Sequence, residues 1–330
     1  MRKGEVMVKN LLKHFVFKMP KDFIKMFYMI YNYLKFPEYR EIKKSFGNLN
    51  SDKTFYIIRP RPGKVEGLMA LFLDVIKQLD YADKQGYIPI VDFKNYETQY
   101  YEKGKNAWEI YFKQVSQFSL EEVYKSKNVI LSGLNVLEKS PEYLNQKYDD
   151  ISLTYARNLV SKYIKLNDTI ENLVDKEIER LDIKNCLGLY LRGTDYVKMK
   201  PAGHPVQPTV HQAMDKVDEY LLSNTQKNIF LVTEDYEIST VIKEKYGSKV
   251  KTIKEDSYIK NYNGDNFIGI DACINQLGNE PSKRGVGYLI KLVLLSKCEN
   301  IIAGNTCGSW GACVFATKFQ KTYVFDLGKY

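Results

Sequence analysis

The segment CLGLYLRGTD, residues 186–195, passes without a break from an apolar run into an arginine, a glycine and an aspartate. An apolar run of this length is typical of a buried strand, which we place at residues 186–191. A polar loop follows to Pro208, then helical periodicity over 209–223 and a second apolar run over 229–233. Strand, helix and strand in this order predict a parallel α/β unit.

The same alternation continues on both sides of this unit. Towards the C-terminus we expect helices over 238–246, 286–296 and 309–316, and strands over 300–303 and 323–325. Towards the N-terminus, strands over 55–58 and 87–92 flank a helix over 68–85 that ends at Gly86. The pattern predicts an α/β protein with parallel sheets in two facing Rossmann-like halves, whose ligands lie between them at the carboxyl ends of the strands.

Three regions follow from this organisation. Residues 1–50 are expected to form a basic, amphipathic helical segment. Residues 51–180 are expected to form an N-terminal Rossmann-like acceptor domain, and residues 181–330 a C-terminal Rossmann-like donor domain. Apolar residues at helical spacing between Asp149 and Lys184 predict a linking helix at the end of the first domain.

Composition and charge exclude several protein classes. Hydrophobic residues make up 44% of the 330 residues and charged residues 27%, which excludes collagen-like and wholly disordered chains. The net charge is +9, but residues 1–36 carry +6 of it, with eight Lys or Arg against Glu5 and Asp22. In the remaining chain the positive and negative charges nearly balance, and no nucleic-acid-binding module is recognisable, so we expect no nucleic-acid partner.

The cysteine pattern and the hydropathy bear on the compartment and on metals. The five cysteines form no C-x-x-C pair and no zinc spacing, which is typical of reduced thiols in a cytosolic protein and predicts no metal site. No apolar stretch approaches 20 residues, and no signal-peptide pattern is present. We therefore expect a cytoplasmic protein.

The N-terminal segment has a pattern of its own, which bears on attachment to membranes. Apolar residues from Phe23 to Leu34 recur at helical spacing among lysines, which predicts one or two short amphipathic helices over residues 8–36. A basic helix of this kind suits peripheral attachment to an anionic membrane, here the inner face. The alternative is a helix packed on its own domain with solvated lysines.

The polar residues that follow the predicted strands are the candidate site residues. Arg192 offers a planar five-donor fork for phosphate oxygens, Gly193 permits close approach of the backbone, and Asp195 can orient the arginine. Thr233, Glu234 and Asp235 end the next strand, where they could hold a ribose or base. Thr306, Cys307, Gly308 and Ser309 begin a helix whose free N–H groups could meet an anion.

Each of these residues also has a structural interpretation. Arg192 and Asp195 could form an ordinary surface ion pair, and Glu234 and Asp235 could simply begin a helix, since acidic residues favour the first turn. His204, one of three histidines, is a candidate general base or a structural side chain.

Taken in order, these motifs resemble the GDP-fucose-dependent fucosyltransferases, which include core α1,6-fucosyltransferases, rhizobial nodulation fucosyltransferases and, more distantly, protein O-fucosyltransferases. The family's His-x-Arg-Arg-Thr-Asp strand end reads Tyr190 to Asp195 here, followed by His204-Pro205. Its Ala-Thr-Asp-Asp strand end corresponds to residues 232–235. Its Arg-Gly-Val and Ser- and Thr-rich motifs correspond to residues 284–286 and 304–309.

The resemblance implies a bacterial GT-B enzyme that inverts the sugar, needs no metal or other cofactor and takes a GDP-sugar as donor. It implies donor binding by Arg192, Gly193, Thr233, Glu234, Asp235, Arg284, Thr306, Cys307, Gly308 and Ser309, and catalytic roles for Arg192, Asp195 and His204. A weaker similarity in the N-terminal half implies acceptor binding near Gly67, Asp92 and Trp108.

The sequence departs from the family pattern at four positions. Gly193 stands for the second arginine, Tyr190 for the leading histidine, Lys200 for a glutamate proposed as general base, and Leu289 for an aspartate of some members. These departures place the base and the sugar identity in doubt more than the phosphate role of Arg192.

The expected reaction is transfer of L-fucose, or a related deoxyhexose, from a GDP-sugar to a glycan hydroxyl in surface polysaccharide or glycoconjugate synthesis, with an acceptor that could be lipid-linked. The alternatives are another NDP-hexose as donor, or a catalytically degenerate glycan-binding homologue.

Overall fold

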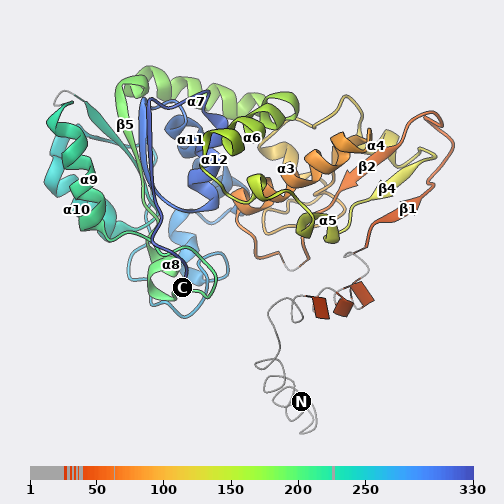
Figure 1. Ribbon diagram of the computed structural model, residues 1–330, viewed down its shortest axis with the longest axis horizontal. Coiled ribbons are helices and arrows are strands. Elements are labelled where there is room, and N and C mark those ends of the chain that lie inside the picture. Colours follow the sequence, from red (N-terminus) through yellow and green to blue (C-terminus); the bar gives the residue numbers. More distant parts are fainter. Residues whose placement is uncertain are drawn as a thin grey trace, which may run out of the picture.

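The computed structural model describes residues 26–27, 30–31, 33–34, 36, 40–62, 64–224 and 227–330. Two sheets with helices against them form an N-terminal half and a C-terminal half, side by side in Figure 1. This arrangement confirms the predicted α/β class with parallel sheets.

The C-terminal half contains a five-stranded, fully parallel sheet of order β7-β6-β5-β8-β9. The strands are β5 (Cys186–Tyr190), β6 (Asn228–Val232), β7 (Val250–Lys251), β8 (Asn300–Gly304) and β9 (Lys321–Phe325). In chain order this is 3-2-1-4-5, the order of a Rossmann-like sheet. Central strand β5 is buried at every residue, which explains its uninterrupted apolar sequence.

Helices cover both faces of this sheet (Figure 1). Helices α9 (Val210–Leu222) and α10 (Tyr236–Tyr246) lie on one face, where Leu187 and Leu189 of β5 join a core with Ala213. Helices α7 (Asp168–Leu181), α11 (Pro281–Leu295) and α12 (Cys307–Phe315) lie on the other face, towards the N-terminal half.

The N-terminal half contains a four-stranded sheet of order β1-β4-β2-β3. Strands β2 (Phe55–Ile58), β3 (Ile88–Val91) and β4 (Val129–Leu131) are parallel, and β1 (Ile42–Lys44) is an antiparallel edge strand on β4. Helix α3 (Leu68–Lys84) connects β2 to β3, and the short helices α4 (Leu120–Val123) and α5 (Asn135–Glu138) flank β4. Strand β1 lies inside residues 1–50, for which the sequence analysis expected helix.

Helix α3 lies against α12 and joins the two halves in one hydrophobic core. A Cβ at Gly311 of α12 would overlap the terminal methyl of Met69, so the glycine lets the methionine lie against the helix. Phe72 of α3 contacts Phe112 and Phe315, with ring centroids 5.5 and 5.0 Å apart. The core therefore continues from one sheet to the other and fixes their separation.

The predicted linking helix between Asp149 and Lys184 is wrong in one respect, because it is two helices. Helix α6 (Asp150–Tyr163) and α7 are separated by an extended segment whose backbone pairs with the segment after Trp108. Lys113 N–H donates to the Lys165 carbonyl over 2.8 Å, and Asn167 N–H donates to the Tyr111 carbonyl over 3.0 Å. Apolar periodicity continues through such a break, so periodicity alone could not reveal it.

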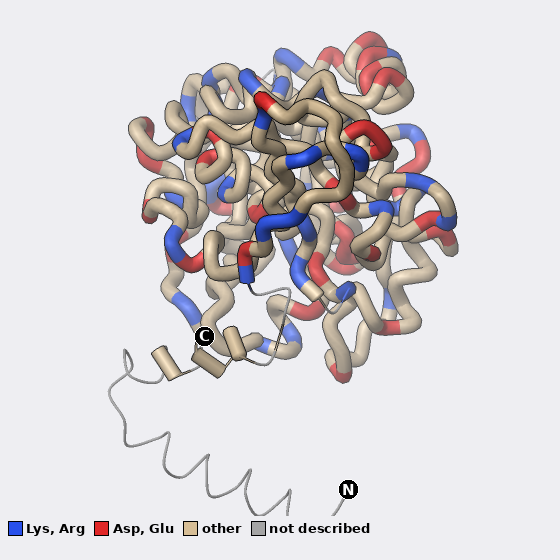
Figure 2. Tube along the Cα trace, turned by 90° about the vertical axis from the view of Figure 1, so that its right-hand side faces the viewer, with Lys and Arg blue, Asp and Glu red and all other residues tan. Residues whose placement is uncertain are grey.

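Most of residues 1–36 lie outside the described residues, and so does most of the predicted amphipathic segment. The described apolar residues there are exposed, namely Met26, Phe27, Ile30 and Leu34. Among the described helices, none combines the length and the apolar character required to cross a bilayer. In the view of Figure 2, Lys and Arg positions are interspersed with Asp and Glu positions.

Because one core spans both halves, truncating Phe72 should weaken the whole protein. We expect Phe72→Ala to lower the free energy of unfolding by about 3–5 kcal/mol, since a fully buried ring is lost and a cavity remains. Urea denaturation followed by circular dichroism should show one transition at lower urea. The control Leu222→Ala, at an 81% exposed helical position, should stay within about 0.5 kcal/mol. A separate early transition of one half would contradict a shared core.

Candidate functional site

The C-terminal sheet places its site between β5 and β8. Chain connections leave these two neighbouring strands towards opposite faces of the sheet. In open α/β sheets ligands bind at the carboxyl ends of such strands, and we call this position the crevice. The loop with Arg192 follows β5, and the start of α12 follows β8. The structure thus brings together two motifs that are more than 100 residues apart in the chain.

Arg192 is held between two acidic side chains. Its Nη2 donates to Asp195 Oδ1 over 3.0 Å, and its Nε lies 3.4 Å from Glu234 Oε1. Asp195 Oδ1 also accepts from the Tyr196 N–H, and its Oδ2 from the Ile268 N–H. The Asp195 oxygens are therefore engaged in positioning the arginine and its loop.

Part of the Arg192 guanidinium stays available. The Arg192 side chain is 19% exposed. Within the described chain, its buried Nε has no hydrogen-bond acceptor, and its Nη1 donates no hydrogen bond. Burial lowers the pKa of Arg192, but the charges of Glu234 and Asp195 raise it by more, so the group remains a cation. The crevice thus presents a fixed guanidinium group with unused donors.

Glu234 holds the backbone of the loop as well as the arginine. Its Oε1 accepts from the Gly193 N–H over 3.0 Å and from Thr194 Oγ1 over 2.8 Å. Thr194 has φ 43°, a left-handed conformation that these bonds maintain in a non-glycine residue. Burial raises the pKa of Glu234, the Asp195 charge adds to this, and Arg192 opposes it.

Thr233, Gly193 and Asp235 have structural partners in this loop. Asp235 caps α10 by accepting from the Ile238 N–H over 3.1 Å, and its other oxygen accepts from the Thr194 N–H over 3.2 Å. Thr233 Oγ1 accepts from the Asp235 N–H. A Cβ at Gly193 would lie 2.6 Å from the Asp235 Cβ, so the glycine is required for this close approach.

The start of α12 forms the second wall of the crevice. Thr306 and Ser309 form a capping box, in which the Ser309 N–H donates to Thr306 Oγ1 over 3.1 Å. The N–H groups of Cys307 and Gly308 donate no hydrogen bond within the described chain. Tyr148 Oη lies 2.9 Å from Ser309 Oγ and binds the Thr306 carbonyl, which fixes this helix end.

His204 lies beside this site, separated from Arg192 by Tyr196. Its ring contacts Tyr196 edge-on at 5.2 Å, and the Arg192 guanidinium lies 5.1 Å from the Tyr196 ring centre. The loop of His204 pairs with the chain end, because the Tyr330 N–H donates to the His204 carbonyl over 3.1 Å. His204 is thus placed at the rim of the crevice rather than against the arginine.

Arg284 begins α11 at the boundary between the halves. Its Nη1 donates to the Gly278 carbonyl over 2.7 Å. Burial lowers the pKa of Arg284, and Tyr100 and Tyr111 oppose that effect. Burial raises the pKa of Tyr100 to about 12, and Arg284 and Arg192 both oppose that effect.

Two of the three predicted acceptor residues are wrong, because they are buried. Asp92 accepts from the Lys94 and Asn95 N–H groups and from Tyr124 Oη over 2.7 Å. Trp108 is 1% exposed and donates its indole N–H to the Lys113 carbonyl. Only Gly67, the exposed N-cap residue of α3, remains available to a ligand.

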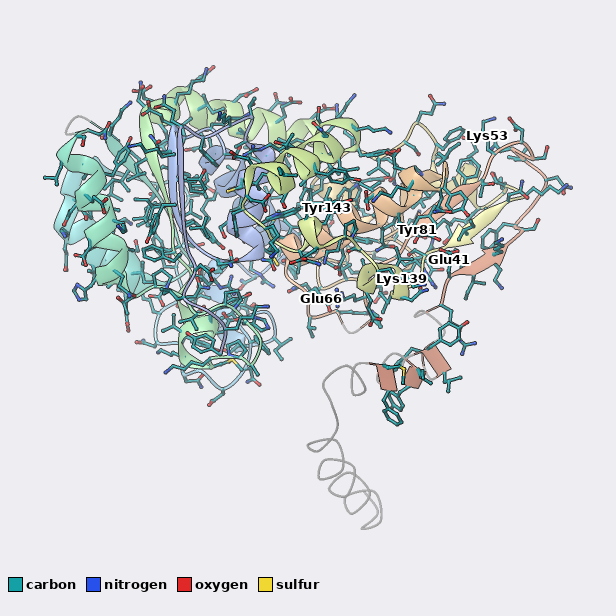
Figure 3. The ribbon with its side chains drawn as sticks, in the orientation of Figure 1. Glu41, Lys53, Glu66, Tyr81, Lys139 and Tyr143 are labelled. Carbon is teal, nitrogen blue, oxygen red and sulfur yellow. The ribbon has the colours of Figure 1, made fainter. Side chains whose placement is uncertain are left out.

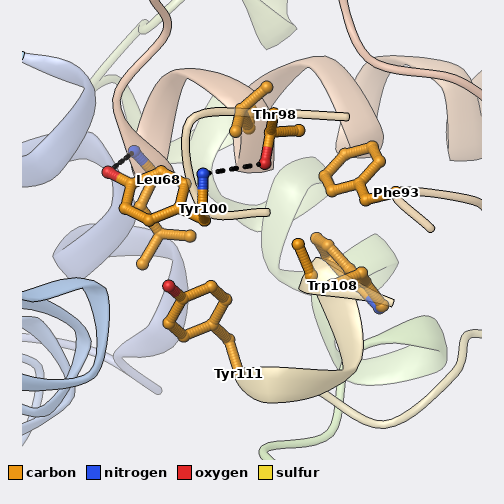
Figure 4. Close-up of a pocket in the computed structure, with 8 residues that line it drawn as sticks. Leu68, Phe93, Thr98, Tyr100, Trp108 and Tyr111 are labelled. Atoms are coloured by element: carbon orange, nitrogen blue, oxygen red, sulfur yellow. Dashed lines mark hydrogen bonds between the residues drawn. The ribbon is translucent and has the colours of Figure 1, made fainter. Parts of the chain in front are cut away.

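The small cavity beside Trp108 is no sugar site either. It measures about 10 Å³, which is space for a single water, and apolar side chains make up most of its lining (Figure 4). Tyr100 lies at its edge, where its hydroxyl accepts from the Leu68 N–H over 2.9 Å.

A larger groove opens in the N-terminal half, between the loops after β2 and β4. It encloses about 310 Å³ and is lined by Phe36, Arg61, Pro62, Glu66, Leu134, Leu137 and Glu138. Figure 3 labels Glu66 on this side of the half, near α5. The groove lies at the carboxyl ends of β2 and β4, where the chain leaves β2 for α3 and β4 for α5, and these two helices pack against each other.

The sequence analysis missed this groove because it missed β4. Strand β4 has only three residues, too few to establish a period, and without it β2 has no recognisable neighbour on that side. A useful signal was the loop after β2, where Arg61 and Glu66 follow a buried strand. In the described chain, no group of His, Cys, Asp and Glu has the arrangement of a metal site.

Comparison with known proteins yields structural matches only. The selenomethionine form of fucosyltransferase NodZ from Bradyrhizobium superposes with a TM-score of 0.51 at 15% identity, covering 83% of this chain and 95% of that one. The chain has a fucosyltransferase-like fold. The match confirms the predicted GT-B class. No protein-family profile and no curated protein matches the sequence.

Two further structures give lower scores. NodZ alpha-1,6-fucosyltransferase soaked with GDP-fucose has a TM-score of 0.49 at 15% identity, covering 83% of this chain and 96% of that one. POFUT1 in complex with GDP has a TM-score of 0.38 at 11% identity, covering 84% and 75%.

The raised pKa of Glu234 predicts a pH-dependent difference from Glu234→Gln. Native Glu234 keeps its proton above its ordinary pKa of 4.5, where the unfolded chain releases it, so the native state binds more protons in that window. The free energy of unfolding of the wild type should therefore fall relative to the variant as pH rises above 4.5. Urea denaturation of both proteins between about pH 4 and 7 measures this. If the free energy of unfolding of the wild type instead rises relative to that of Glu234→Gln as pH increases, the pKa of Glu234 is not raised.

Proposed function

We propose that this protein transfers L-fucose, or a related deoxyhexose, from a GDP-sugar to a hydroxyl of a glycan, with inversion at the sugar. The observation that carries the proposal is Arg192, a buried cation with unused donors at the switch point of a fucosyltransferase-like fold. The named structural neighbours, fucosyltransferases solved with GDP or GDP-fucose, support this choice of donor.

Departure of a nucleoside diphosphate places growing negative charge on the β-phosphate, so the enzyme must supply donors aimed at that charge. Arg192 supplies Nη1, and the start of α12 supplies the N–H groups of Cys307 and Gly308. Asp195 and Glu234 hold the arginine in place before the donor binds, so little reorganisation remains for the reaction. We propose that no metal takes part.

The acceptor would bind in the groove of the N-terminal half, opposite the donor. Arg61 and two carboxylates line that groove, Glu66 and Glu138, which suits hydrogen bonding to sugar hydroxyls. A general base must reach the attacking hydroxyl, and the groove carboxylates are candidates beside His204. Lys200 cannot act as a base while protonated. A role in polysaccharide or glycoconjugate synthesis follows if that hydroxyl belongs to a surface glycan.

Substitution of Arg192 tests this proposal. We expect Arg192→Ala to lower kcat/KM for GDP-fucose by about 10²–10³-fold, because a preorganised donor to the leaving group is lost. Arg192→Lys should also be poor, because a point charge cannot replace a planar fork. Release of GDP in the presence of EDTA is the measurement, with acceptor glycans and with water as acceptors. Full loss of activity in EDTA, restored by Mg²⁺ or Mn²⁺, would contradict metal independence.

The donor and the alternatives are separated by binding. In thermal-shift measurements with GDP, UDP and CDP, we expect GDP to stabilise the protein most. A larger shift with another nucleotide would mean that the donor carries that nucleotide, while the protein would still be a glycosyltransferase. Binding of GDP without any turnover, including slow hydrolysis, would favour a glycan-binding homologue. Retention of most activity in Arg192→Lys would exclude the phosphate role.

Attachment to membranes is a separate part of the proposal. Residues 1–36 carry six net positive charges, and half of the usual 1 kcal/mol for each surface charge would give roughly 3 kcal/mol on anionic lipid. We expect the chain to sediment with anionic liposomes at low salt and to detach at high salt. Deletion of residues 1–36 should abolish the binding. Binding that survives the deletion would assign it to another surface.

A further inference from the structure

The N-terminal half has cations of its own on and beside α3, the helix that packs against α12. Asp74 and Lys77 lie one turn apart on α3, and Arg61 lies in the loop after β2. Arg61 binds Asp74 through both nitrogens of its fork, Nε to Oδ2 over 2.6 Å and Nη2 to Oδ1 over 3.0 Å. Both Asp74 oxygens are therefore occupied by Arg61.

Lys77 is left with an uncompensated charge. It is only 9% exposed, and its one hydrogen bond in the described chain goes to a neutral acceptor, Asn145 Oδ1, over 2.6 Å. No carboxylate of the described chain forms an ion pair with it. Burial lowers the pKa of Lys77, which is the sign of an ammonium group without an adequate counter-charge. A buried cation of this kind is stabilised by an anion that binds next to it.

The segment that binds Lys77 also contacts the start of α12, and α3 itself packs against α12 through Met69 and Gly311. Tyr148, three residues after Asn145, contacts Thr306 and Ser309, so the segment that accepts from Lys77 also fixes this helix end. Burial raises the pKa of the Cys307 thiol to about 11, and Asp74 adds to this.

Cations from both halves oppose that shift at Cys307, namely Lys77, Arg192 and Arg61. These three cations therefore act on the residue whose N–H group is free at the helix start. Because Asp195 and Glu234 already balance Arg192, the excess positive charge comes from the N-terminal half.

We propose that Lys77, with Arg61 beside it, completes the diphosphate-binding site from the opposite half of the molecule. This inference rests on the proposed function, since it takes the diphosphate of the nucleotide donor as the anion. Arg192 and the α12 N–H groups bind the diphosphate from one side, and Lys77 binds it from the other. The N-terminal half then contributes to donor affinity as well as to acceptor binding.

Lys77→Met tests the assignment, because methionine keeps the volume and removes the charge. We expect the Kd for GDP to rise by about tenfold or more, while the Kd for guanosine changes by less than about twofold. Lys77→Arg should restore part of the affinity for GDP. Isothermal titration calorimetry with GDP, guanosine and inorganic pyrophosphate supplies the measurements.

Lys84→Met is the matched control. Lys84 lies two turns further along α3, is bonded to Asp80 and is half exposed, so its loss should leave GDP binding unchanged. Thermal unfolding of each variant checks that it is folded; replacing a buried, poorly paired charge by an apolar side chain is expected to preserve stability.

The outcomes separate this inference from the proposed function. If the wild type binds GDP and Lys77→Met binds it equally well, the role of Lys77 is wrong and the proposed function stands. If Lys77→Met loses GDP and guanosine equally, Lys77 only supports the structure and the inference is overturned. If the wild type binds pyrophosphate in a Lys77-dependent manner but not GDP, the anion site stands and the donor is wrong. Binding of neither overturns both.

Discussion

The contact between α3 and α12 determines how the two halves of the molecule meet. Met69 lies against Gly311, and Phe72 lies against Phe315, so the helices approach closely and bury one continuous core. Each helix begins directly after the loop of a central strand, α3 after β2 and α12 after β8. Their packing therefore brings the carboxyl ends of both sheets to the same boundary, and the position of every candidate ligand group depends on it.

Charge at this boundary is arranged in two layers. Asp195 and Glu234 hold Arg192 from behind and largely neutralise it, which makes the arginine a rigid donor rather than a strong source of field. Arg61 and Asp74 form a similar neutral pair in the opposite half. Lys77 is the group left over, and a buried charge without a partner is costly unless a ligand compensates it. Asp235, a predicted site residue, holds the loop in place by accepting from the Thr194 and Ile238 N–H groups.

The groove of the N-terminal half and the crevice of the C-terminal half both lie at the carboxyl ends of two neighbouring parallel strands. In the C-terminal sheet, β5 and β8 send their connections to opposite faces, whereas in the N-terminal sheet the helices that follow β2 and β4 pack together on one face. Arg61 and Glu66 occupy one of these positions, and Arg192 and Cys307 occupy the other. Donor and acceptor chemistry would thus use the same feature of the fold twice, on either side of one boundary.

The sequence alone determined the α/β class, the strands β2, β3, β5, β6, β8 and β9, and the loop with Arg192, because buried strands and amphipathic helices leave local periodic patterns. It did not reveal β1, β4 or the break between α6 and α7, whose short extended segments exist through backbone pairing with distant residues. Nor could it distinguish Asp92 and Trp108, which are buried, from accessible residues of the same type. The packing of α3 on α12 was decided by tertiary structure alone, because Met69 and Gly311, which lie against each other, are about 240 residues apart in the chain.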